Sequence, residues 1–165
     1  MAALEAGVAA PDFTLNGMNG GKISLAEARK KGPVVAAFFK ISCPVCQYAF
    51  PYLERIFKAY TQSPVTLVGV SQNEKKETSD FAREYGITFP LLLDDTRSYP
   101  VSNGYGLTTV PSIFLISPGG KVELSSVGWS KQDIEELNAR VAQASGVAPA
   151  KIFKPGEHVD DFKPG

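Results

Sequence analysis

Two cysteines stand three residues apart, as Cys43-Pro44-Val45-Cys46, and the chain of 165 residues has no other cysteine. Two cysteines placed at random in a chain of this length would have this separation in roughly 1% of cases. So close a pair can form and break one disulfide reversibly. A chain of this size buries enough apolar surface to be stable without such a bridge. The pair therefore indicates redox chemistry rather than a structural staple.

Composition predicts a soluble globular chain. The sequence is 44% hydrophobic and 21% charged, and no run approaches the roughly 20 apolar residues that span a bilayer. Lys plus Arg and Asp plus Glu both number 17, so no excess charge attracts nucleic acid or an anionic membrane. We expect no nucleic-acid partner and no membrane segment, and we expect a monomer.

The first ten residues do not have the pattern of a secretory signal. They carry Glu5 and lack a basic stretch followed by an apolar core. A cytoplasmic location follows from the sequence as written. A periplasmic or other extracytoplasmic location follows if a signal or anchor was removed, so both compartments stay open.

Apolar periodicity and turn residues predict alternating strands and helices in residues 1–146, the expected domain. Pro118-Gly119-Gly120 predicts a tight turn between two antiparallel strands. The predicted elements are strands at 33–40, 65–71, 89–93, 112–117 and 121–127, helices at 44–62, 74–85 and 131–144, a loop or short helix at 96–104, and an N-terminal hairpin of 12–15 with 22–24, followed by a small helix that Ser24 caps.

Residues 147–165 form a tail rich in proline and glycine, in which Phe-Lys-Pro-Gly occurs at 153–156 and again at 162–165. The composition predicts no regular element, and Lys-Pro-Gly is typical of a turn. Two alternatives remain open. Phe153 and Phe162 anchor the tail on the domain or on a partner, or the tail is mobile.

The first cysteine is expected to be the nucleophile. Proline favours the first helical position, so Pro44 makes Cys43 the N-cap of the helix that follows. Backbone N–H groups and the positive end of the helix dipole then stabilise a Cys43 thiolate. Cys46 lies under the same turn, more enclosed, and is expected to resolve a mixed disulfide. Zinc would need four ligands, and the only histidine, His158, lies in the tail, so we expect no metal and no cofactor.

Strand, cysteine pair and helix together resemble the thioredoxin fold, in particular the TlpA-like and redoxin (AhpC/TSA-related) branch of thiol:disulfide oxidoreductases. The resemblance covers residues 10–146. Ala10-Pro11-Asp12-Phe13-Thr14-Leu15 is similar to the opening segment of that branch, and Pro51 falls where its active-site helices carry a proline. Thr109-Val110-Pro111 resembles the cis-proline loop of the fold.

The resemblance implies an α/β thioredoxin-like fold, with a central mixed sheet flanked by helices, an N-terminal hairpin extension and an irregular C-terminal tail. It also implies that Pro111 is cis and lies against the cysteine pair. The backbone of Thr109 and Val110 is then expected to bind an extended substrate segment.

The sequence also departs from the family pattern. Buried carboxylates that serve the second cysteine in relatives are replaced by Ala37 and Ala49, and Ser42 stands where thioredoxins usually have Trp. Lys40 is the nearest ionisable residue in sequence. It either stabilises the Cys43 thiolate by its charge or points to solvent.

Thiol:disulfide exchange with a protein partner is the predicted function, and its direction does not follow from the sequence. A peroxiredoxin-type peroxidase is one alternative, although Lys40 and Ala36 stand where that family needs Thr and Pro. A non-catalytic binding module is the other, but a pure adaptor has no use for a reactive cysteine pair.

Overall fold

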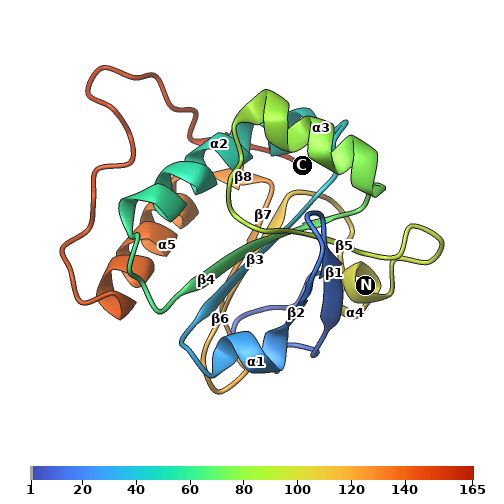
Figure 1. Ribbon diagram of the computed structural model, residues 1–165. Helices are drawn as coiled ribbons and strands as arrows, with labels where there is room; N and C mark the ends of the chain where they lie inside the picture. Colours follow the sequence, from blue (N-terminus) through green and yellow to red (C-terminus); the bar gives the residue numbers. More distant parts are fainter. Residues whose placement is uncertain (1) are drawn as a thin grey trace.

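A mixed seven-stranded sheet forms the centre of the protein in a computed structural model that describes residues 2–165 (Figure 1). Its strand order is β2-β1-β5-β4-β3-β6-β7, in which β3 and β5 run parallel to β4 and the other neighbours are antiparallel. The strands are β1 Thr14–Gly17, β2 Lys22–Ser24, β3 Val34–Phe39, β4 Thr66–Ser71, β5 Leu91–Leu93, β6 Ser112–Ile116 and β7 Val122–Val127. A separate two-stranded sheet pairs β8 Trp129–Ser130 with β9 Phe162–Lys163.

Helices cover both faces of the large sheet. They are α1 Leu25–Arg29, α2 Pro44–Ala59, α3 Lys75–Tyr85, α4 Pro100–Gly104 and α5 Lys131–Ala144. Buried residues of α2, α3 and α5 share one hydrophobic cluster, and those of α1 belong to the cluster on the opposite face. The predicted fold class, a mixed sheet flanked by helices with an N-terminal hairpin, is therefore confirmed.

Strand β3 is buried on both faces, which explains its uninterrupted apolar sequence. Val35 and Phe39 point into the cluster with α2, while Val34 and Phe38 point into the other. Because β3 is packed on both faces and hydrogen-bonded to β4 and β6 along its two edges, the position of its carboxyl end is well defined. The cysteine pair begins four residues beyond that end.

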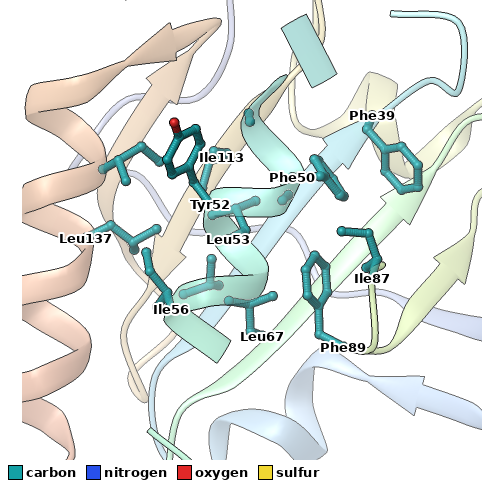
Figure 2. Packing of buried hydrophobic residues seen from close by; sticks show 14 of the residues in the cluster. Phe39, Phe50, Tyr52, Leu53, Ile56, Leu67, Ile87, Phe89, Ile113 and Leu137 are labelled. Atoms are coloured by element: carbon teal, nitrogen blue, oxygen red, sulfur yellow. The ribbon is translucent and has the colours of Figure 1, made fainter. Parts of the chain in front are cut away.

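Helix α2 lies across the sheet and fills the space between the strands and α5 (Figure 2). Phe50, Leu53 and Ile56 are buried along its inner face. The ring of Phe50 packs 4.4 Å from that of Phe39, centroid to centroid. This apolar packing fixes the helix, and with it the position of its first turn.

A buried carboxylate ties α2 to the loop before β5. Glu54 accepts the backbone N–H groups of Thr88 at 2.8 Å and Phe89 at 3.3 Å, and the Thr88 hydroxyl at 2.5 Å. Lys58 pairs with the same carboxylate at 3.6 Å. Burial of this charge is compensated by these partners, so Glu54 orients the helix without leaving an unsatisfied group.

Most element boundaries lie within one residue of the prediction, but three differ by more, and the first of these is β1, which spans Thr14–Gly17 rather than 12–15. Helix α2 ends at Ala59 rather than residue 62, and β5 begins at Leu91 rather than residue 89. Pro90 explains the later start of β5, because proline has no N–H to donate to a strand ladder. The open choice at 96–104 resolves as the short helix α4.

Most of the tail is docked on the domain. Ile152 and Val159 are buried in the cluster that contains α2 and α5. Arg55 of α2 forms two hydrogen bonds with Glu157, at 2.7 and 2.8 Å, and the Arg55 guanidinium lowers the pKa of that carboxyl to about 2. The mobile alternative is therefore wrong for this segment, and the tail shares the core of residues 1–146.

The two Phe-Lys-Pro-Gly copies differ in structure and in how far their phenylalanines are buried. In the first, Phe153 packs on the rings of Tyr52 and Trp129, and the Glu157 N–H donates to the Lys154 carbonyl at 3.0 Å, closing the predicted turn. In the second, Phe162 is 62% exposed and belongs to β9. The expectation of no regular element was wrong here, because these residues pair with β8.

Substitution Ile152→Ala tests whether the tail is part of the core. Its side chain is 6% exposed, so we expect the free energy of unfolding to fall by about 2 to 4 kcal/mol in urea titrations. Val147→Ala is the matched control, because Val147 is 54% exposed and its loss should change stability by less than about 0.5 kcal/mol. Equal, small effects of both variants would mean that the tail adds nothing to the core.

Candidate functional site

Cys43 occupies the N-cap of α2, as predicted, with Pro44 in the first turn. Its Sγ accepts the backbone N–H of Cys46 at 3.1 Å, and its own N–H donates to the Lys40 carbonyl at 3.3 Å. The side chain is half-buried. The sulfur therefore lies at the amino end of α2, against a backbone N–H group of its first turn.

Cys46 lies three residues further on, in the first turn of α2, and is fully buried. Burial raises the pKa of its thiol, and the hydrogen bond with Cys43 raises it further. Both cysteines are free thiols. The same helical turn thus holds one accessible sulfur and one enclosed sulfur that stays protonated at neutral pH.

The loop before β6 lies against the first cysteine. The Val110-Pro111 peptide bond is cis, and the Cys43 thiol donates to the Val110 carbonyl at 3.5 Å. Pro111 is buried, whereas Thr109 and Val110 are half-buried. Ser112 holds the loop by donating its hydroxyl to the Thr109 carbonyl at 2.9 Å. The structure therefore brings together all of the predicted loop residues and Cys43.

Two side chains that the sequence analysis did not assign to the site fix the segment before Cys43. The Ile41 N–H donates to Oδ1 of Asn73 at 3.0 Å, and Gln47 Nε2 donates to the Ile41 carbonyl at 2.9 Å. Asn73 follows β4, the parallel neighbour of β3, so both segments leave the same edge of the sheet. This adjacency of two parallel strand ends is the signal that could have predicted a contact between Asn73 and the site.

Lys40 is exposed, so the structure places its side chain in solvent. The backbone of Lys40 is what contacts the site, through the bond from the Cys43 N–H. Ala37 and Ala49 are fully buried. Neither position offers a carboxylate to the buried thiol, in agreement with the departures noted from the sequence.

The part of the chain that the structure describes contains neither a cluster of metal-ligating side chains nor a membrane-spanning helix. Within residues 2–165, no group of three or more His, Cys, Asp or Glu side chains lies close enough to hold a metal ion. No helix among these residues is long and apolar enough to cross a bilayer.

Comparison with known proteins decides the family. The family model described as AhpC/TSA family matches residues 6–125. The chain belongs to the AhpC/TSA family. A relative from Geobacillus thermodenitrificans, named thiol-disulfide oxidoreductase ResA, is 34% identical over 136 residues, which cover 81% of this chain and 76% of the relative. The protein of that name from Bacillus subtilis is 35% identical over 120 residues, covering 72% of this chain and 65% of the relative.

Solved structures of other proteins have the same fold as this AhpC/TSA family member. A putative thiol:disulfide interchange protein DsbE from Chlorobium tepidum superposes with a TM-score of 0.75 at 27% identity, covering 87% of this chain and 100% of that one. The thioredoxin-like fold and the resemblance to thiol:disulfide oxidoreductases of the TlpA-like and redoxin branch are thereby confirmed.

The raised pKa of Cys46 predicts how stability depends on pH. Above the usual thiol pKa of about 8.5, the unfolded chain loses this proton while the folded chain keeps it, so the free energy of unfolding of the reduced protein falls as pH rises. We expect the Cys46→Ala variant to show a shallower decline, by about 1 kcal/mol per pH unit, in urea titrations between pH 8.5 and 9.5. Parallel pH profiles for both proteins would contradict the burial of a protonated thiol.

Proposed function

We propose that this AhpC/TSA family member exchanges the Cys43–Cys46 dithiol with a disulfide of a protein partner, acting as a monomer. Cys43 attacks and Cys46 resolves. The observation that carries this assignment is the contrast within one helical turn, where the half-buried Cys43 sulfur receives a backbone N–H at 3.1 Å and Cys46 is fully buried.

The reaction is two successive displacements at sulfur. The Cys43 thiolate attacks one sulfur of the partner disulfide, whose S–S bond breaks, and the departing partner thiolate takes up a proton. Cys46 then gives up its proton and attacks the Cys43 sulfur of the mixed disulfide. The Cys43–Cys46 bond forms, the bond between Cys43 and the partner breaks, and the second partner sulfur leaves as a thiolate that takes up a proton, so two electrons have passed to the partner. Run backwards, the same steps oxidise a partner dithiol.

The loop at Thr109–Val110 gives a polypeptide partner a place to bind. Val110 is half-buried, and within residues 2–165 no backbone or side-chain group accepts its N–H. An extended segment that pairs with this backbone brings its own sulfur next to Cys43, since the Val110 carbonyl lies 3.5 Å from the Cys43 sulfur. A protein substrate fits this loop. An extracytoplasmic site of action fits such a partner, because protein disulfides persist in oxidising compartments.

Trapping tests the two roles. In a Cys46→Ala variant the first displacement proceeds and the second cannot, so a mixed disulfide through Cys43 should accumulate on a disulfide-bonded polypeptide and be visible by mass spectrometry. A Cys43→Ala variant is the matched control and should give little adduct, because Cys46 is buried. Adducts that form mainly through Cys46 would reverse the assignment. A partner that stays bound non-covalently to a Cys43→Ser, Cys46→Ala double variant would favour a binding module.

The rate of reaction with hydrogen peroxide distinguishes a thiol:disulfide oxidoreductase from a peroxidase. We expect hydrogen peroxide to oxidise Cys43 in the reduced protein at the rate of an ordinary thiolate, because Lys40 and Ala36 replace the residues that a peroxidatic loop needs. Stopped-flow measurement of the intrinsic fluorescence of Trp129 and the tyrosines follows the oxidation. A rate orders of magnitude above that of a free thiol would establish a peroxidase instead.

A further inference from the structure

The C-terminal strap, residues 160–165, reaches the loop to which the proposed function assigns the partner. A Cβ built at Gly165 would lie 2.5 Å from the Val110 carbonyl oxygen and 2.8 Å from Oγ1 of Thr109. That carbonyl oxygen is the acceptor of the Cys43 thiol. The strap and an incoming polypeptide therefore need the same backbone surface.

Contacts with the domain hold the strap in this place. Trp129 donates its Nε1–H to the Asp160 carbonyl at 2.6 Å, and the Asp160 N–H donates to the Tyr48 hydroxyl at 3.0 Å. Trp129 and Ser130 then pair with Lys163 and Phe162. In Figure 1 the tail leaves α5, passes along the outer side of the helices and returns toward β8.

A glycine in the domain lets the strap approach the loop closely. Gly128 has a φ of +75°, and a Cβ there would lie 2.5 Å from the Lys163 carbonyl oxygen and 3.0 Å from the Gly165 nitrogen. The Gly128 N–H donates to the Pro111 carbonyl at 2.8 Å. The strap is thus in close contact with two segments next to the cis-proline, the loop at Thr109–Val110 and the chain at Gly128.

The outer end of the strap is held more weakly than the rest of the tail. Regular pairing is limited to the two residues of β9, and a two-stranded pair this short is marginal by itself. Phe162 is 62% exposed, and the side chains of the Lys163–Asp160 ion pair, 2.9 Å apart, are 38% and 36% exposed, so each contact stabilises this end less than a buried contact would. A polypeptide that offers a better partner to Val110 can displace this end.

We propose that the strap determines substrate access. It covers the Val110 backbone, so a polypeptide disulfide must displace residues 163–165 before it reacts, whereas a small disulfide that contacts only the Cys43 sulfur reacts with the strap in place. The inference rests on the proposed function, because it takes Val110 as the partner's binding backbone.

Substitution Gly165→Ala tests this directly. The added methyl group meets backbone of the loop, which cannot yield as a flexible side chain does, so the strap end must move away from Val110. The second-order rate constant for reaction with a disulfide-bonded peptide should rise about threefold or more, because the open fraction of molecules increases. The rate constant with oxidised glutathione should stay unchanged.

Gly119→Ala is the matched control. It makes the same chemical change in the exposed turn between β6 and β7, where a Cβ meets only Ser117 Oγ, at 3.7 Å. Neither rate constant should change in this variant. An unchanged peptide rate constant in Gly165→Ala overturns the proposal, since the strap would then have no effect on access. A lower rate constant also overturns it, since the strap would then form part of the surface that binds the partner.

A second variant acts on the strap without touching the loop. Lys163→Ala removes the ion pair with Asp160 and the contact of the ammonium with the Tyr48 ring, 5.0 Å from its centroid. It should raise the peptide rate in the same selective way, with faster hydrogen exchange at Phe162 and Lys163. If exchange becomes faster and the peptide rate does not, the strap is no barrier. If the unmodified protein reacts with neither disulfide, the proposed function itself fails.

Discussion

The hydrogen bond from the Cys46 N–H to the Cys43 sulfur is the interaction on which the site depends. It exists because α2 begins at Pro44, so that the preceding residue is the N-cap and its side chain meets the free N–H groups of the first turn. The three-residue spacing then places the second sulfur below that turn, in the core. Two chemically identical side chains thus differ in burial through position alone, since Cys43 is half-buried and Cys46 is fully buried.

Packing of the domain keeps that turn in place. Strand β3 is paired on both edges and buried on both faces, and α2 is fixed above it by Phe50, Leu53 and Glu54. Asn73 and Gln47 hold the intervening Ile41 from two directions. The segment between strand and helix therefore has little freedom, which is what a sulfur that must meet a partner in a defined geometry requires.

The sequence predicted those features that depend on residues close together in the chain, such as a helix start or a buried strand. Proline at the first helical position located Cys43, and uninterrupted apolar residues identified β3. The cis bond at Pro111 was expected from family resemblance alone, because no periodicity reports the isomer of a peptide bond. Asn73 was missed, since its contact with Ile41 spans 32 residues and depends on the parallel pairing of β3 with β4. The docking of the tail was left undecided for the same reason. Ile152 and Val159 have no periodic pattern around them, and their burial depends on surfaces that α2 and α5 create together.

The family match and the geometry address different questions. Membership of the AhpC/TSA family and relatives named thiol-disulfide oxidoreductases place the chain among proteins of this chemistry, while the structure shows that one sulfur is half-buried and the other fully buried. The absence of a carboxylate at Ala37 and Ala49 means that the buried thiol must lose its proton without a neighbouring acceptor at those positions.

The inequality of the two sulfurs can be measured most directly by alkylation. Reduced protein treated at neutral pH with less than one equivalent of iodoacetamide, then digested and mapped by mass spectrometry, reports which thiol reacts first. We expect label on Cys43 and almost none on Cys46, because only the Cys43 sulfur is partly accessible. Equal labelling of both residues, or preferential labelling of Cys46, would contradict this unequal reactivity.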